Sequence, residues 1–269
     1  MARKTYLIIP VFLPFAGCPS MCVFCDQKGI TGSRSLPEPA DVRATVELYL
    51  STWRRGGRIE IAFYGGSFTG LSSETQRRYL SVAREYVSAG RVDSVRVSTR
   101  PDYISGDVVE MLASYGVDTV ELGVQSMSDE VLTASGRGHT AEAAVRAVSI
   151  LKAAGMKTGI QIMPGLPGDS VTSVLDTVEK VAALAPDFVR IYPTVVLKET
   201  KLHDMYLAGA YRPWEMDEMV GVCAQAALRF AGAGIPVIRM GLASSEGLAH
   251  RVVAGPYHPS FRQLVEKGA

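Results

Sequence analysis

The chain has 269 residues and a formal net charge of +1, with 47% hydrophobic and 20% charged residues. This composition is typical of an ordinary soluble globular protein, and the near-neutral charge gives no electrostatic argument for a nucleic-acid or membrane partner. The length suffices for one large α/β barrel or two small domains.

The N-terminal region contains a basic pair, Arg3-Lys4, followed by an apolar run over residues 6–13. The run resembles the core of a signal peptide, but Pro10 and Pro14 interrupt it and no A-x-A-like cleavage site follows. We therefore expect residues 6–13 to form a buried strand. No stretch of the sequence is long or apolar enough to predict a membrane span.

Compact apolar runs then alternate with amphipathic helical patterns. The expected strands are 6–13, 59–64, 92–97, 117–124, 158–163 and 188–192, with a last short strand at 237–240. The expected helices are 37–53, 73–88, 107–115, 140–154, 171–182 and 215–231, and a capping box at Ser73 and Gln76 is expected to open the second of them.

Strand followed by helix at this interval predicts parallel βαβ units. The sequence contains six full strand–helix units, fewer than the eight of a closed TIM barrel. We therefore expect an α/β fold: a partial (β/α)6 TIM-like barrel of parallel strands with a small C-terminal extension. No clear domain boundary is visible. We expect residues 1–195 to form the barrel core and residues 196–269 to supply the last barrel elements and the extension, as a single structural unit.

Three of the four cysteines, Cys18, Cys22 and Cys25, lie within eight residues at a C-x3-C-x2-C spacing. This spacing is unlike a disulfide framework, and reduced thiols indicate a reducing compartment, so we expect a cytoplasmic protein. Cys223 lies in an apolar helical stretch and is expected to be a buried structural thiol.

The three clustered thiols are expected to converge on one point, in a loop directly after an apolar strand. A closed structural zinc site or a conventional ferredoxin cluster needs four protein ligands, so three thiols leave one coordination position open. Two other interpretations remain at this point: a three-cysteine zinc site with a distant fourth ligand, and thiols clustered by chance.

Polar residues stand where the apolar runs end. They are Gly65-Gly66-Ser67, Ser98-Thr99-Arg100-Pro101, Gln125-Ser126, Gln161 and Tyr192-Pro193. In a parallel barrel these carboxyl ends lie on one face, where active sites are built. The cysteine loop (residues 18–25) follows the first strand, so we expect it on the same face.

Each feature also has a plainer explanation. Gly65-Gly66 is either a tight turn or a place where the backbone approaches the charged end of a ligand. Gln125 is either a satisfied core amide or a ligand contact. Arg137, in a glycine-rich loop, is either exposed or a bidentate partner for a carboxylate. The run Gly159–Gly168 suggests a rigid surface for a flat ring.

With these segments in order, the chain resembles radical S-adenosylmethionine (SAM) proteins over roughly residues 8–242. Within that superfamily it resembles stand-alone bacterial relatives of the catalytic subunit of the Elongator complex. It is more distantly similar to oxygen-independent coproporphyrinogen III oxidase. The segments that carry the resemblance are FAGCPSMCVFC (15–25), FYGGSF (63–68), STRPD (98–102), ELGVQS (121–126), GRGHT (136–140), MPGLPGD (163–169) and RIYPT (190–194).

The resemblance implies specific roles. Cys18, Cys22 and Cys25 would ligate a 4Fe–4S cluster, whose fourth iron is chelated by the amino and carboxylate groups of SAM. The implied SAM contacts are Phe24 near the adenine, Gly65, Gly66 and Ser67 at the amino group, Ser98, Gln125 and Gln161 at ribose or methionine, and Arg137 facing the carboxylate.

The implied reaction is one-electron reduction of the cluster, by a flavodoxin- or ferredoxin-type donor, followed by cleavage of SAM to methionine and a 5′-deoxyadenosyl radical. That radical abstracts hydrogen from the substrate, and tRNA is the substrate that Elongator-like ancestry suggests. Cofactors carry the chemistry in such enzymes, while the protein positions them.

Some residues depart from the family pattern. Gly-Gly-Ser replaces the usual Gly-Gly-Glu, and Gln27 replaces a further cysteine of the coproporphyrinogen oxidases, which weakens a haem-pathway function. We expect no acetyltransferase domain in this chain. Tyr192, Lys198 and His203 are either substrate contacts or surface residues. The alternatives are a non-catalytic iron–sulfur or zinc-binding module and a coproporphyrinogen-oxidase-like radical SAM protein.

Overall fold

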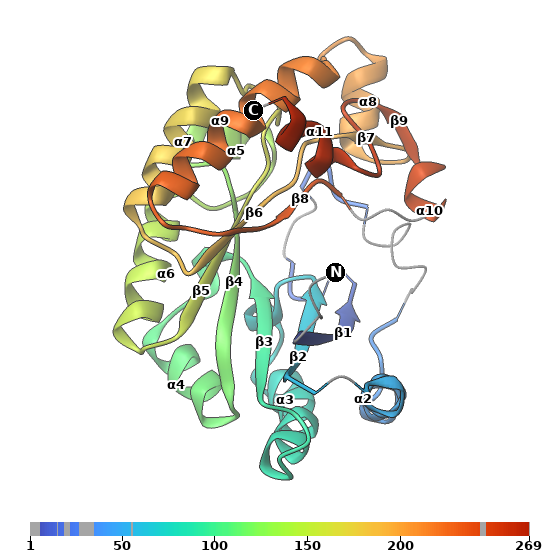
Figure 1. Ribbon diagram of the computed structural model, residues 1–269, viewed down its shortest axis with the longest axis vertical. Helices are drawn as coiled ribbons and strands as arrows, with labels where there is room; N and C mark the ends of the chain where they lie inside the picture. The colour runs from blue at the N-terminus through green and yellow to red at the C-terminus, as the bar shows by residue number, and fades with distance from the viewer. Residues whose placement is uncertain are drawn as a thin grey trace.

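The computed structural model describes residues 6–14, 16–18, 22–26, 35–54, 56–242 and 246–268. Its main element is a seven-stranded sheet in the order β1-β2-β3-β4-β5-β6-β8, in which every neighbouring pair is parallel. The strands are β1 (Tyr6–Leu13), β2 (Arg58–Gly65), β3 (Ser94–Thr99), β4 (Val117–Gln125), β5 (Lys157–Ile162), β6 (Phe188–Ile191) and β8 (Val237–Met240). The sheet curls into a half-barrel, as the sequence predicts (Figure 1).

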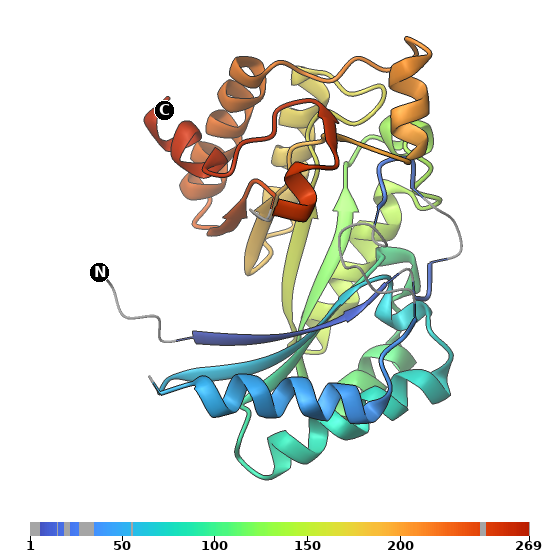
Figure 2. The same cartoon turned by 90° about the vertical axis from the view of Figure 1, so that its right-hand side faces the viewer.

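Helices connect successive strands and cover the outer side of the sheet (Figures 1 and 2). They are α2 (Pro39–Thr52), α3 (Ser73–Ser88), α4 (Gly106–Ser114), α5 (Asp129–Ala134), α6 (Ala141–Ala153), α7 (Val171–Ala183) and α9 (Met216–Gly232). Short polar side chains begin several of them: Ser105 accepts from Val108 N, and Thr140 from Ala143 N. Such caps satisfy amides that have no partner inside the helix.

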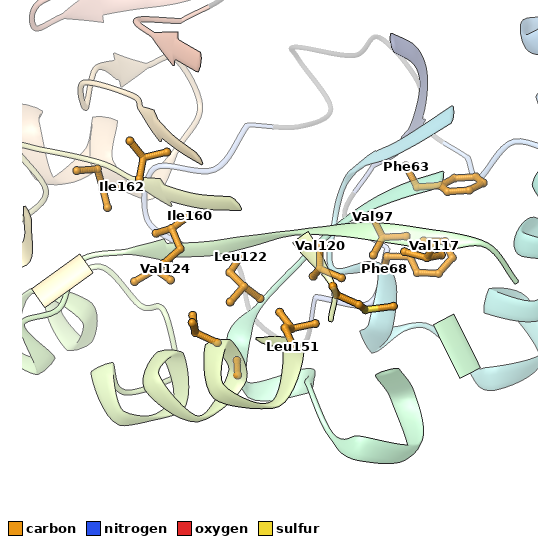
Figure 3. Packing of buried hydrophobic residues seen from close by; sticks show 14 of the residues in the cluster. Phe63, Phe68, Val97, Val117, Val120, Leu122, Val124, Leu151, Ile160 and Ile162 are labelled. Atoms are coloured by element: carbon orange, nitrogen blue, oxygen red, sulfur yellow. The ribbon is translucent and has the colours of Figure 1, made fainter. Parts of the chain in front are cut away.

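The hydrophobic core lies between the sheet and these helices. Successive strand residues point to opposite faces, so Val120, Leu122 and Val124 of β4 face the helices, where they are buried (Figure 3). Phe63 of β2 packs its ring 5.1 Å from that of Phe68. The apolar runs in the sequence are therefore the helix-facing sides of the strands.

The concave side of the sheet carries charged residues at the alternate positions. Arg96 of β3 lies between Glu60 of β2 and Glu121 of β4, and all three are buried. Arg190 of β6 also pairs with Glu121, donating from Nη2 to Oε1 across 2.9 Å. Buried charges persist only when paired, and here two guanidinium groups meet two carboxylates. This ion network fills the concave side of the half-barrel.

The C-terminal part of the chain contributes both to the main sheet and to a smaller unit. Its strand β8 pairs with β6, and α11 (Phe261–Lys267) packs near it. The smaller unit contains a separate antiparallel pair of strands, β7 (Val196–Leu197) and β9 (Val252–Ala254). It also contains the helices α8 (Lys201–Leu207) and α10 (Glu246–Ala249), and it lies above the main sheet (Figure 2). The predicted extension is thus present.

Three local predictions are corrected. The N-cap of α3 is Ser72, whose hydroxyl accepts from Thr75 N, and Gln76 donates instead to the carbonyls of Thr69 and Leu71. The third strand begins at Ser94, two residues later than expected. The first strand has the predicted bounds but lies at the sheet edge, so Phe12 is 49% exposed rather than buried.

Cys223 of α9 is fully buried, and burial raises the pKa of its thiol to about 12, which confirms the prediction of a structural thiol. Over the described part of the chain, no helix has the length and apolar character needed to cross a membrane. Of the predicted loop over residues 26–32, the structure describes only Asp26. Gln27 lies outside the described residues.

Candidate functional site

One pocket opens at the carboxyl ends of the strands. Every residue that the resemblance assigns to the cluster or to SAM lines it, together with five that were not assigned a role. The lining residues are Cys18, Cys22, Phe24, Cys25, Gly65, Gly66, Ser67, Ser98, Thr99, Arg100, Glu121, Leu122, Gly123, Gln125, Arg137 and Gln161. The parallel order of the strands brings these segments together, because all their carboxyl ends reach the same edge.

The three clustered cysteines line this pocket from one side. Cys22 is buried, Cys18 and Cys25 are partly exposed, and the Sγ of Cys18 lies 3.7 Å from Oγ of Ser67. Within the described ranges, no three His, Cys, Asp or Glu side chains lie close enough to hold a single metal ion. Each cysteine of an iron–sulfur cluster binds a different iron, so such a group does not require thiols that meet around one ion.

Glycines bring the turn after β2 into direct contact with the backbone that precedes Cys18. Ser67 N donates to Ala16 O across 2.7 Å, and Gly66 N donates to Leu13 O across 2.9 Å. A Cβ added at Gly66 would lie 2.0 Å from Ala16 O, and Gly65 has a φ of +111°. Only glycine fits at these two positions, since any side chain would separate the turn from the loop.

Arg137 is buried rather than exposed. Its Nη1 donates to Sγ of Cys22 across 3.1 Å, and its Nη2 donates to Gly123 O. Its Nε donates to Nε2 of His139 across 3.3 Å. The guanidinium is therefore fixed beside a cysteine of the pocket.

His139 orients Arg137 and was missed by the sequence reasoning. Burial, and then the neighbouring Arg137 cation, lower the pKa of His139 from 6.5 to about 4. The imidazole is therefore neutral at pH 7. Its Nδ1 lies 3.3 Å from Thr140 O, so Nδ1 carries the proton and Nε2 is free to accept from Arg137. The short spacing in Arg137-Gly138-His139 was the available signal.

Arg100 is a second guanidinium in the pocket lining. It is buried and forms two hydrogen bonds to Asp102, at 2.9 and 2.7 Å. Its remaining Nη1 is buried and has no hydrogen-bond partner among the described residues. A buried charged donor without a partner is unfavourable, so this atom suits an anionic or carbonyl ligand.

The two glutamines face each other across β4 and β5. Gln161 donates from Nε2 to Oε1 of Gln125 across 3.0 Å. Gln125 has a φ of +71°, and the register of the two strands shifts between Gly123 and Gln125. A positive φ at a residue other than glycine is uncommon, and bulges near functional sites redirect side chains. Both glutamines belong to the lining of the pocket.

Three other candidate contacts do not join this pocket. Tyr192 accepts from Nη1 of Arg190 at 3.1 Å, Lys198 is exposed, and His203 lies in α8; none of them is among the described lining residues. The turn Met163–Gly168 is fixed, since Gly165 N donates to Asp169 and Gly165 O accepts from Tyr211. Its residues are absent from the lining, whereas Gln161 of the same run (159–168) lines the pocket, so a rigid surface for a flat ring stays a prediction.

The residues present fit a 4Fe–4S cluster with SAM. The cysteines offer three sulfur ligands, and the glycine turn admits a ligand close to the backbone. Arg100 has a buried donor with no partner among the residues that the structure describes. Arg137 and the paired amides add polar groups suited to a carboxylate and a ribose.

Comparison with known proteins agrees with this arrangement. The model of the radical SAM superfamily matches residues 12–181, and the radical SAM C-terminal domain matches residues 186–268. A tRNA uridine(34) acetyltransferase of Methanocaldococcus infernus is 28% identical over 259 residues, covering 81% of this chain and 48% of that protein. The chain spans about half the length of such curated relatives.

Solved structures show the same fold. The Elp3 protein of Methanocaldococcus infernus, with an N-terminal deletion, has a TM-score of 0.75 at 24% identity, covering 98% of this chain and 62% of that one. Coproporphyrinogen III oxidase of Escherichia coli has a TM-score of 0.60 at 18% identity, covering 85% and 53%. Enzymes of this class use a 4Fe–4S cluster and SAM. By the match to its family model, the chain belongs to the radical SAM superfamily.

Proposed function

We propose that this chain binds a 4Fe–4S cluster through Cys18, Cys22 and Cys25 and cleaves SAM reductively, to modify a base of tRNA. The observation that carries the proposal is the convergence of all the predicted ligand residues on one pocket. When bound, the cluster and SAM would supply a carbon-centred radical that abstracts a hydrogen atom from the substrate.

The residues of the chain have separate tasks in this proposal. The glycine turn at Gly65 and Gly66 and the hydroxyl of Ser67 receive the amino group of SAM, where relatives carry a glutamate. Arg137, oriented by His139, faces the carboxylate, and Phe24 lies near the adenine. Ser98, Gln125 and Gln161 contact the ribose or the methionine. Arg100 adds a guanidinium that the sequence did not single out.

The proposed substrate rests on the names of related proteins, not on the net charge of the chain. Three of the matched relatives carry the name tRNA uridine(34) acetyltransferase, which supports a tRNA base as the substrate. Several surface arginines are already paired, for example Arg78 with Glu38 and Arg91 with Glu47, so they contribute little free positive charge for phosphates. A one-electron donor of the flavodoxin or ferredoxin type completes the proposed reaction.

The test is anaerobic reconstitution followed by addition of SAM and a strong reductant. We expect brown protein that contains iron and sulfide and forms 5′-deoxyadenosine. The Cys22→Ala variant should lose both the cluster and the product, while Cys223→Ala should keep both. A fully loaded wild-type cluster that gives no 5′-deoxyadenosine refutes the enzymatic proposal.

The choice of tRNA is tested separately, by transfer of deuterium from labelled tRNA into 5′-deoxyadenosine. A salt titration of tRNA binding gives a second measurement, because phosphate contacts weaken steeply as salt rises. Absence of both tRNA binding and label transfer from an enzyme that cleaves SAM would reject tRNA as substrate and leave SAM cleavage intact.

A further inference from the structure

The small C-terminal unit lies directly against the cysteine loop. In Figures 1 and 2 the described dark-blue part of this loop lies at the base of α8. Leu202 N, at the start of α8, donates to Val23 O across 2.8 Å. On the other side, Val23 N donates to Ser135 O across 3.1 Å. The backbone between Cys22 and Cys25 is therefore held by α8 and by the end of α5.

Apolar packing accompanies these two hydrogen bonds. Val23 and Phe24 pack against a buried cluster formed by Val196, Leu202 and Tyr211. This cluster belongs to the C-terminal unit, not to the main core. The position of the cysteine loop thus depends on residues that lie more than 170 positions further along the chain.

An ion pair makes a third contact, at the residue after Cys25. Arg251 donates from Nε to the carboxylate of Asp26, whose side chain is 9% exposed against 21% for Arg251. Arg251 is itself fixed: its Nη2 donates to Lys198 O across 2.9 Å, and its carbonyl accepts from Lys198 N across 2.9 Å. Glu199 also lies 3.3 Å from Nη2.

The location of this pair has an electrostatic consequence. A nearly buried carboxylate next to a cluster ligand disfavours the addition of an electron to the cluster, and an arginine that compensates the carboxylate opposes this effect. Net charge, hydrogen bonding and exposure are the features that set the potentials of iron–sulfur clusters. Removing one partner of a buried pair leaves the other charge with less compensation.

We propose that Arg251 is a positioning residue which, through Asp26, holds the cysteine loop and raises the reduction potential of the bound cluster. The inference rests on the proposed ligation of the cluster by Cys18, Cys22 and Cys25. It assigns the C-terminal unit a part in the electron-transfer step. A purely structural tether would change stability and leave the potential unaltered.

The experiment is a charge cycle on the reconstituted full chain: wild type, Arg251→Met, Asp26→Asn and the double variant. Arg146→Met is the matched control, because Arg146 pairs with Glu142 on the surface of α6 and with no other acidic residue that the structure describes. Iron and sulfide contents are measured first. The midpoint potential of each cluster is then determined by redox titration followed by electron paramagnetic resonance.

We expect Arg251→Met to make the reduction equilibrium about tenfold less favourable, which is 59 mV for one electron. The double variant should return towards the wild-type potential, because both charges are gone. Asp26→Asn alone should not lower the potential, and Arg146→Met should not change it. Both single variants at the pair should also release iron to a chelator faster than wild type does.

Each other outcome has a clear meaning. Unchanged potentials in Arg251→Met and the double variant overturn the inference while the proposed function stands. If Arg251→Met does not fold, the variants Asp26→Asn and Arg251→Lys test the inference instead. A lowered reduction potential in Asp26→Asn contradicts the electrostatic argument. Arg251→Lys keeps the positive charge and should keep the wild-type potential. A wild-type chain that binds no cluster overturns the proposed function and this inference together.

Discussion

Nη1 of Arg137 donates a hydrogen bond to Sγ of Cys22 across 3.1 Å, although 115 positions separate the two residues in the chain. The contact joins the loop after β1 to the loop between α5 and α6. It places a guanidinium directly beside the sulfur atom of Cys22, one of the three thiols that line the pocket. The same guanidinium also contacts His139 and the carbonyl of Gly123.

Replacement of Arg137 by Met should weaken SAM binding to the cluster-loaded chain roughly 10- to 100-fold, because a hydrogen bond to a charged group contributes about 1.5–3 kcal/mol. Anaerobic calorimetry measures the affinity. His139→Ala should have a smaller effect in the same direction, and His139→Gln, which retains an acceptor, should recover part of it. Equal affinities in wild type and Arg137→Met would contradict the assigned contact.

The pH dependence of stability should carry the signature of His139. Its pKa is about 4 in the folded chain against an ordinary 6.5, so the unfolded chain binds more protons between these values. This pKa difference contributes about 3 kcal/mol to the free energy of unfolding. The contribution is fully present above pH 6.5 and is lost as the pH falls towards 4. Urea unfolding at pH 7 and pH 4.5 measures it.

The control for this pH effect is His139→Gln, which cannot titrate. The difference in unfolding free energy between wild type and this variant should be larger at pH 7 than at pH 4.5. A difference that is the same at both pH values would show that the folded imidazole titrates near its ordinary pKa.

Gly66→Ala should destabilise the chain by about 1–3 kcal/mol, a cost typical of overpacking, because the added Cβ meets Ala16 O at 2.0 Å. It should also reduce uptake of iron, since the turn and the cysteine loop can no longer touch. Gly221→Ala in α9 is the control: its Cβ meets nothing within 4 Å, so this change should stabilise by up to about 1 kcal/mol. Denaturant unfolding and iron analysis distinguish them.

Arg96→Met should lower the free energy of unfolding by about 3–5 kcal/mol, because it leaves the buried carboxylates of Glu60 and Glu121 with less compensating positive charge. The exposed pair of Arg146 and Glu142 provides the comparison, and Arg146→Met should cost only about 0.3–0.5 kcal/mol. Urea titrations of both variants test the contrast. Similar losses of unfolding free energy in the two variants would mean that the buried ion network stabilises the fold no more than the exposed pair does.

Much of the fold follows from patterns that are local in the sequence. Apolar runs of strand length alternate with amphipathic helices, and this alternation alone predicts parallel strands whose carboxyl ends share one face. The cysteine spacing and the polar residues at the strand ends then predict the pocket. These inferences succeed because side-chain periodicity is determined by residues only a few positions apart.

The errors arise where the local pattern does not decide the structure. Ser72 and Ser73 are both suitable N-caps, and only the path of the chain after the turn at Phe68–Gly70 selects Ser72. The strand at Tyr6–Leu13 has the apolar content of a buried strand, yet its place in the sheet order puts it at an edge and exposes Phe12. Periodicity contains no information on which strand ends a sheet.

The site was predictable as a set of residues but not as a set of contacts. The sequence by itself determined the three thiols, the glycine turn and the alternation that brings them to one face. Only the tertiary structure decided that Arg137 is buried against Cys22 and that Arg251 reaches Asp26. It also left Nη1 of Arg100 without a partner in the described part of the chain. Such pairs form between residues far apart in the chain, so they exist only once the whole sheet has curled and packed.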